Sequence, residues 1–395
     1  MTHALVICRH GYRSPNTTTP PTPIEVGPDI TPKHVTLPSY GATFAENLLN
    51  HTLSHTLPGV VDKVLSLSFP QRGKVEGKTR KTSNIKTMKH LQTRTYADSA
   101  VSRCQQTAVA WASHLNAKTT CGVPTKPDEP VDPRVNQTAA EATLDQQRWT
   151  SDQQIVGSQL RPCAQAQWSR LLYLLGFERK AQSTLSATST PTPIVGAQRA
   201  LIFLGLPPNT FVFATAVIMA FGLPGKTVFE LLDHAGWPRA RTCNGHQLYR
   251  AASRLLATIL AVRYPAGYVA DTVSTAVSRL ALHYLRDNCP NRSLLASVCT
   301  HEEHMHFLRT ALGLGGSSYA RPASALLFVL CDATQTMRVY ELHNRISRCG
   351  KVQRRVNVER LKDVSLMQFQ RLAAQSILQA PPFICASTFG HGCPV

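Results

Sequence analysis

A short cationic segment near the start of the chain contains the residue types of an anion site. Residues 9–15 read Arg-His-Gly-Tyr-Arg-Ser-Pro, directly after an apolar run that is typical of a buried strand. The guanidinium groups of Arg9 and Arg13 match the geometry of phosphate oxygens, and the imidazole of His10 between them can act as a nucleophile. Because two positive charges nearby disfavour an imidazolium, we expect His10 to be neutral when no ligand is bound.

A second group of candidate residues follows another apolar run, nearly 300 residues later. The run leads into Thr-His-Glu-Glu-His, in which His301, Glu302 and Glu303 are the candidates. Clusters of His and Glu bind zinc when two histidines lie four residues apart on one face of a helix. The spacings from His301 to His304 and His306 are three and five residues, so the zinc template fails and we predict no metal site.

The first segment resembles the signature of the histidine acid phosphatases, Arg-His-Gly-x-Arg-x-Pro directly after a first strand. This family is the second branch of the histidine phosphatase superfamily and includes the phytases. The resemblance implies an α/β fold, with a phosphoglycerate-mutase-like core whose mixed, mainly parallel sheet is flanked by helices. It also implies an inserted, mostly α-helical cap. We therefore expect the core at residues 1–117 and 241–395, and the cap at residues 118–240.

The same resemblance implies a role for each residue of the two segments. His10 attacks phosphorus and forms a phosphohistidine, while Arg9, Arg13 and His301 bind the phosphate oxygens. A third pocket arginine comes from a loop that precedes a Ser-Ala or Thr-Ala pair on a helix. Arg103 matches this spacing, because Thr-Ala follows it at residues 107–108, and Arg94 is the competing candidate.

The acid that protonates the leaving alkoxide departs from the commonest family pattern. Most members have Asp directly after the second histidine, where this chain has Glu302. The inositol polyphosphate phosphatases that resemble this family carry His-Ala-Glu, which makes Glu303 the second candidate. Direct alignment slightly favours Glu302, and both stay open.

Hydrophobic patterns predict the elements that position these residues. Strands are predicted at residues 4–8, 64–69, 294–299, 323–330 and 337–342, and residues 200–204 are a further candidate. Helices are predicted at residues 40–57, 109–115, 164–178, 210–221, 226–234, 247–262, 272–285, 307–314 and 366–377. Since strands that end side by side share one sheet edge, we expect His10 and His301 to meet there.

The charge of the chain limits its partners. A net charge of +19 favours anionic ligands, and basic residues gather at positions 72–89. No aromatic residue is interleaved with them, which argues against a single-stranded nucleic acid platform. We therefore expect a phosphorylated small-molecule substrate, no cofactor and no nucleic acid. Because no apolar stretch approaches the length of a membrane span and no signal peptide is recognised, we expect a cytoplasmic protein, although a secreted one stays open.

Three functions compete at this point. The first is a phosphomonoester hydrolase acting on inositol phosphates or other polyanionic phosphoesters. The second is a catalytically weak or inactive homologue that binds phosphorylated ligands, since Glu replaces the usual Asp. The third is a nucleic-acid-binding protein driven by its charge.

Overall fold

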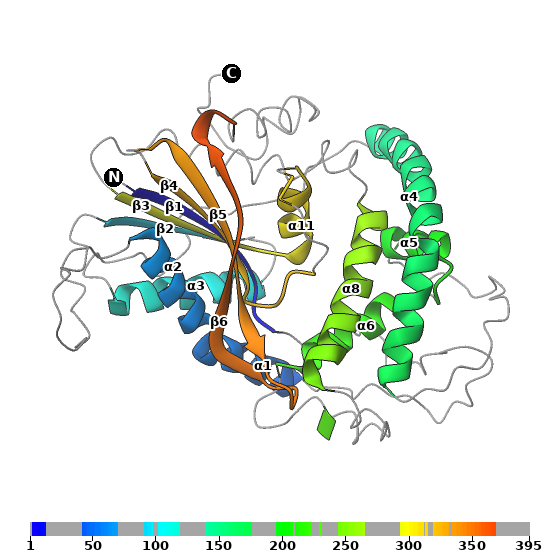
Figure 1. The fold of residues 1–395 in the computed structure, drawn as a ribbon, viewed down its shortest axis with the longest axis horizontal. Coiled ribbons are helices and arrows are strands. Elements are labelled where there is room, and N and C mark those ends of the chain that lie inside the picture. Colours follow the sequence, from blue (N-terminus) through cyan, green and yellow to red (C-terminus); the bar gives the residue numbers. More distant parts are fainter. Residues whose placement is uncertain are drawn as a thin grey trace.

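A six-stranded sheet and a layer of helices beside it make up the described part of this computed structural model (Figure 1). Arg13 and the basic segment at 72–89 lie outside the described residues, as do the predicted helix at 272–285 and most of those at 226–234 and 366–377. The described residues are 2–12, 42–69, 91–97, 102–118, 139–175, 195–207, 210–222, 229–230, 244–264, 293–311, 313–314, 319–331 and 334–368.

The sheet is mixed, as predicted. Its strands, in the order β2-β3-β1-β4-β5-β6, are β1 (Thr2–Arg9), β2 (Leu91–Ala97), β3 (Ser293–Thr300), β4 (Ala325–Cys331), β5 (Thr336–Ile346) and β6 (Val352–Ser365). β1 and β2 run parallel to β3, whereas the pairs β1–β4, β4–β5 and β5–β6 are antiparallel. The expectation of a mainly parallel sheet therefore holds only for the half formed by β1, β2 and β3. Short connections join β4, β5 and β6 in sequence, and short connections produce hairpins rather than parallel pairs.

Helices cover both faces of this sheet (Figure 1). The described helices of at least ten residues are α1 (Ala42–His55), α2 (Leu57–Ser68), α3 (Ser102–Lys118), α4 (Ala139–Leu174), α5 (Val195–Leu204), α6 (Thr210–Ala220), α8 (Gly245–Arg263) and α11 (Glu302–Ala311). Ala4, Val6 and Cys8 of β1 pack with α2 and α3, whereas Leu5 and Ile7 pack with α11. This alternation is the period of two that a strand buried on both faces requires.

The helices α4, α5, α6 and α8 form a layer of their own beside the sheet (Figure 1). Its apolar core includes Trp168 of α4 and Phe213 of α6, whose rings meet edge to face at 5.3 Å. Tyr12, three residues beyond β1, joins the same core and so links the layer to the sheet. The division into core and cap stays a prediction; α8, on the core side of the predicted boundary, packs within this layer. Among the described residues, none of the helices combines the length and the apolar character needed to span a membrane.

Two of the predicted strands are wrong. Residues 64–68 belong to α2 and residues 200–204 to α5. Within α2 the buried residues Val60, Val61 and Val64 recur at helical spacing. A predicted run of five or six residues is too short for the helical and strand periods to be separated. β6 was not predicted, because most of its side chains are exposed and the sequence therefore lacks the alternation of apolar and polar residues that marks a strand.

A buried ion pair fastens α11 to the sheet. The Arg309 Nη1 of α11 lies 3.0 Å from Oε1 and 2.9 Å from Oε2 of Glu341 on β5. Only 6% and 4% of the two side chains are exposed, so each charge depends on the other. Burial raises the pKa of the Glu341 carboxyl, and Arg309 counteracts this effect. The pair therefore holds the helix that begins with Glu302 and Glu303 in a fixed position.

Glu341→Gln removes one charge of this pair, so the buried Arg309 loses its ion pair with Glu341. We expect the free energy of unfolding to fall by about 3 kcal/mol, because removing one partner of a buried ion pair is costly. Urea titration followed by circular dichroism measures this loss. Asp363→Asn is the matched control, since it neutralises a carboxylate in the exposed pair with Arg360 on β6 and should not move the midpoint. Equal effects of the two substitutions would contradict a structural role for the buried pair.

Candidate active site

His10 is held at the edge of the sheet where β1 and β3 both end. Arg9 lies opposite Thr300 in the parallel register, and His10 continues it by donating its backbone N–H to the Thr300 carbonyl at 3.0 Å. The carbonyl of His10 accepts from the N–H of Ala323 at 3.1 Å. Ala323 has a φ of 57°, a backbone conformation that is strained for a residue with a side chain. The backbone of His10 is therefore fixed from both neighbouring segments.

The side chain of His10 is held in one tautomer. Its Nδ1 lies 2.7 Å from the carbonyl oxygen of Gly11. Because a carbonyl only accepts hydrogen bonds, Nδ1 carries the proton and Nε2 presents a lone pair. Nε2 is buried and has no hydrogen-bond partner in the part of the chain that the structure describes. Gly11 in turn donates its N–H to the Thr107 hydroxyl at 3.2 Å, so the Thr-Ala pair of the sequence motif supports this turn.

The charge state of His10 agrees with the expectation from the sequence. Burial, followed by the positive charge of Arg9, lowers its pKa well below 6.5. Arg103 and His301 lower the pKa further, and only Glu302 opposes them. His10 is therefore a neutral imidazole with its lone pair on Nε2, the form in which a histidine is nucleophilic.

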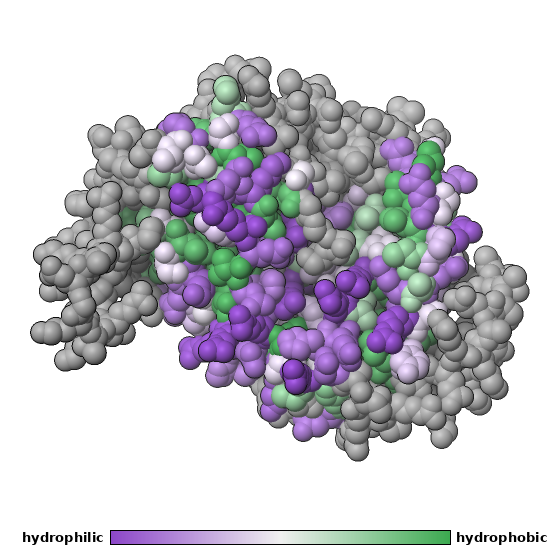
Figure 2. Space-filling model, in the orientation of Figure 1, coloured by the Kyte–Doolittle hydropathy of each residue, from purple (hydrophilic) through white to green (hydrophobic). Residues whose placement is uncertain are grey.

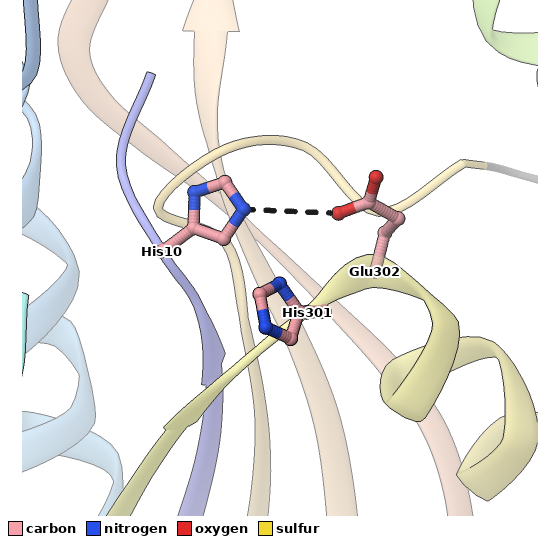
Figure 3. A group of neighbouring side chains, drawn as sticks. All are labelled: His10, His301 and Glu302. Carbon is pink, nitrogen blue, oxygen red and sulfur yellow. Dashed lines mark ion pairs between the residues drawn. The ribbon is translucent and has the colours of Figure 1, made fainter. Parts of the chain in front are cut away.

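His301 meets His10, as the two strand ends predicted (Figure 3). The two rings lie 5.3 Å apart between centroids and are inclined by 73°. The Nε2 of His301 also lies 3.7 Å from the Cys104 sulfur on α3. Three segments that are far apart in the sequence, the ends of β1 and β3 and the start of α3, therefore converge at one point.

Glu302 interacts with Arg9 through an ion pair and with Tyr319 through a hydrogen bond. The Arg9 Nε lies 2.9 Å from Glu302 Oε2, and the Tyr319 hydroxyl donates to Oε1 at 2.9 Å. Arg9 also donates through Nη2 to the Tyr319 oxygen at 3.0 Å and through Nη1 to the Ala320 carbonyl. Burial raises the pKa of Tyr319 well above 10.0, so its hydroxyl keeps the proton that it donates. Glu302 thus accepts a hydrogen bond at Oε1 and forms an ion pair with Arg9 at Oε2.

The Glu302 carboxylate also faces His10. Figure 3 shows it pointing toward the imidazole, and its Oε2 lies 3.9 Å from His10 Nε2. Glu303, the next residue on α11, is placed differently. Its side chain is 25% exposed, and its Oε1 lies 3.6 Å from Arg263 Nη1 at the end of α8. The two candidate acids therefore differ clearly in burial and in partners.

The geometry favours Arg103 over Arg94 as the arginine near the site. Arg103 lies in the first turn of α3, and its charge acts on His10. Arg94 lies inside β2, in register with Ala296, four residues before the end of β3. At about 3.3 Å per residue this places it about 13 Å from the sheet edge. Arg9 is at the site but is already bonded to Glu302, Tyr319 and Ala320.

The site also contains a group of atoms with the spacing of metal ligands. Ligand atoms of His10, His301 and Glu302 all lie within 4.8 Å of one another. The sequence analysis missed this group because its template required all ligands on one helix. A divalent cation does not suit these surroundings, since Glu302 Oε1 accepts a hydrogen bond from Tyr319, Oε2 pairs with Arg9, and the charges of Arg9 and Arg103 repel a cation.

Two members of the site were not predicted from the sequence. Cys104 directly follows Arg103, so the motif that contains Arg103 offered a signal for it. Tyr319 comes 17 residues after Glu302, and no motif or periodicity marks it. Only the folded chain places this phenol between an arginine and a carboxylate.

Comparison with solved structures identifies the fold of the chain. No protein-family model matches the chain, and no curated protein matches it by sequence. Among solved structures, a Hafnia alvei phytase in complex with myo-inositol hexakis sulphate has a TM-score of 0.58 at 14% identity, over 97% of this chain and 98% of that one. A Klebsiella sp. ASR1 phytase has a TM-score of 0.56 at 13% identity, over 98% of both chains. A Citrobacter braakii phytase has a TM-score of 0.53 at 15% identity, over 96% and 98%. The chain thus has the α/β fold of the phytases, which confirms the fold that the resemblance to histidine acid phosphatases implied.

Proposed function

We propose that this protein is a phosphomonoester hydrolase that acts through a phosphohistidine on His10. The observation that carries the proposal is the state of His10 Nε2, which is buried and has no hydrogen-bond partner among the described residues. The hydrogen bond from Nδ1 to the Gly11 carbonyl keeps the lone pair on this nitrogen. In the first step Nε2 forms a bond to phosphorus, the ester P–O bond breaks and the leaving alkoxide takes a proton from a carboxylic acid. In the second step water attacks phosphorus, the P–N bond breaks and the carboxylate takes the proton of the water.

Arginine and histidine side chains around His10 bind the phosphoryl group in this scheme. Arg103 and His301 face His10 from α3 and from the end of β3. Arg13 is proposed to join them on the basis of the sequence motif. Arg9 keeps two of its five N–H groups outside the interactions with Glu302, Tyr319 and Ala320. Such donors stabilise the charge of the equatorial oxygens as the phosphoryl group is transferred.

The proton donor is proposed to be Glu303 rather than Glu302. In-line attack places phosphorus about 3 Å from Nε2, and the donor lies about another 3 Å beyond the leaving oxygen on the far side. At 3.9 Å from Nε2, the Glu302 Oε2 occupies the region of the phosphoryl oxygens instead. A bound phosphate must therefore displace this carboxylate, whereas the partly exposed Glu303 can meet a leaving group beyond it.

The substrate is proposed to be a polyanionic phosphoester such as an inositol phosphate. The net charge of +19 favours such ligands. The fold neighbours are phytases, and one of them was solved with myo-inositol hexakis sulphate. A second candidate function, binding of phosphorylated ligands with weak turnover, is favoured by one observation: Glu302 already lies where the phosphate must bind.

His10→Ala should abolish phosphate release from 4-nitrophenyl phosphate and from inositol hexakisphosphate. The reason is that no other side chain described at the site presents a buried, unshared lone pair. Mass spectrometry after an alkaline quench should detect a phosphoryl group on the wild-type protein but not on the variant. His114→Ala, in the exposed pair with Asp62, is the control and should leave turnover unchanged. Turnover that survives in His10→Ala contradicts the proposal.

Glu303→Gln and Glu302→Gln should respond differently to the leaving group. Without its proton donor, Glu303→Gln should lose about 10²–10⁴ in kcat/KM on an alkyl phosphate, but much less on 4-nitrophenyl phosphate, whose leaving group needs no proton. Glu302→Gln should change kcat/KM for both substrates by the same factor. If Glu302→Gln instead loses much more kcat/KM on the alkyl phosphate than on 4-nitrophenyl phosphate, Glu302 is the donor. If neither variant distinguishes the two substrates, neither residue is the donor.

The acidic limb of the activity profile should lie well below pH 6.5. The lowered pKa of His10 keeps the imidazole neutral as the pH falls, and the nucleophile is lost only when the pH passes below that pKa. Arg103→Met removes a charge that lowers the pKa, so the limb of log(kcat/KM) against pH should move to higher pH. Arg94→Met is the matched control and should leave the limb in place. A wild-type limb near pH 6.5, or an equal movement in both variants, contradicts this reading.

A further inference from the structure

A second basic cavity lies at the junction of α1, β6 and the end of α6. Its volume is about 270 Å³, and its lining contains no acidic side chain. The last two turns of α1 contribute His51 and His55, and the chain at the start of β6 contributes Lys351, directly before the strand, and Arg354 within it. The cavity shares no lining residue with the network of His10, His301 and Glu302, so it is a separate feature of the molecule.

Four basic side chains lie together in the lining of this cavity. Neither Lys351 nor Arg354 forms an ion pair with a carboxylate in the part of the chain that the structure describes. The rings of His51 and His55 lie 4.2 Å apart between centroids, and burial together with the neighbouring imidazole lowers the pKa of His51. Figure 2 shows hydrophilic residues over β6 and its connection to β5. The two neighbouring cations, Lys351 and Arg354, are stabilised by a bound anion.

Aromatic side chains line the inner part of the cavity. Tyr12 and Phe221 are each only 2% exposed and contribute to its lining. Gly222 makes this packing possible, because a Cβ at its position would lie 2.2 Å from Cγ of the Tyr12 ring. A cavity with apolar walls and a few convergent polar groups is typical of a small-molecule site. Here Lys351 and Arg354 are cationic, so the matching ligand has an apolar face and an anionic group.

We propose that this cavity is a second binding site, for a small organic phosphate with a single ring or a short carbon skeleton. The phosphate contacts Lys351, Arg354 and the two histidines, and the carbon skeleton rests on Tyr12 and Phe221. The proposal does not depend on the chemistry of His10, because it concerns binding alone.

The position of Tyr12 connects this site to the nucleophile. Its backbone N–H donates to the Thr52 hydroxyl of α1 at 3.3 Å. Gly11, the acceptor for the Nδ1 proton of His10, packs against the same threonine closely enough that a Cβ on Gly11 would lie 3.2 Å from the Thr52 methyl. A ligand that contacts Tyr12 therefore lies against the turn that fixes the His10 imidazole.

Phenylphosphonate is the probe, because its C–P bond is not an ester and is not hydrolysed. Its ring matches the aromatic wall of the cavity, and its dianionic group matches Lys351 and Arg354. Calorimetric titration of the full chain should give two sites per molecule, one at His10 and one in this cavity. Lys351→Gln/Arg354→Gln should weaken the second site at least tenfold and leave turnover of 4-nitrophenyl phosphate at low concentration unchanged. Because both side chains are exposed, we expect the variant to fold, and its melting temperature checks this.

Arg348→Gln/Arg355→Gln is the matched control, since it removes the same charge from exposed neighbours outside the cavity lining. It should retain both sites. Equal weakening in the two double variants would mean that the overall positive field attracts the probe. Wild-type binding that Lys351→Gln/Arg354→Gln leaves unchanged would mean that the cavity does not bind the probe. Either result overturns the proposal. Binding of Zn²⁺ to His51 and His55 without binding of phenylphosphonate overturns it as well. If His10→Ala stays active while the second site persists, the proposed hydrolase fails and this inference does not.

Discussion

The hydrogen bond from His10 Nδ1 to the Gly11 carbonyl decides what the candidate site can do. It places the proton of a buried imidazole on the nitrogen that faces its own backbone and leaves the other nitrogen with a lone pair. Neighbouring groups hold both residues of this bond in place: the Thr300 carbonyl and the Ala323 N–H bind the His10 backbone, and the Thr107 hydroxyl binds the N–H of Gly11. Strand pairing, a strained residue and a helix from another part of the chain thus converge on one tautomer.

Holding this site together requires buried charges that stabilise the fold only as pairs. Arg9, Glu302 and Tyr319 each contact the other two, so removing one member takes a hydrogen bond or an ion pair from both of the others. Burial also lowers the pKa of His306 to about 4 and that of His343 to about 3. These histidines, like His10, bind protons in the unfolded chain below pH 6.5 but not in the folded one, so acid weakens the fold as the pH falls toward those values. The arrangement that keeps the nucleophile neutral in acid therefore costs stability in acid.

The sequence was sufficient for the parts of the site that lie at strand ends. His10 and His301 could be placed together because each follows an apolar run, and parallel strands bring their ends to one edge. Choosing between Arg103 and Arg94 required the register of β2 on β3, which no local pattern specifies. The difference between Glu302 and Glu303 is a rotation of about 100° around a helix, and only the packing of α11 decides which carboxylate faces the imidazole. Tyr319 contributes through its tertiary position alone.

The most direct test of this account is nitrogen NMR of the His10 side chain in the ligand-free protein. At about pH 5, the account predicts one protonated nitrogen, Nδ1, and a second nitrogen, Nε2, with the chemical shift of an unprotonated imidazole. After reaction with a phosphate ester, the P–N coupling should appear at Nε2. An imidazolium at that pH, or a neutral ring with its proton on Nε2, contradicts the central claim.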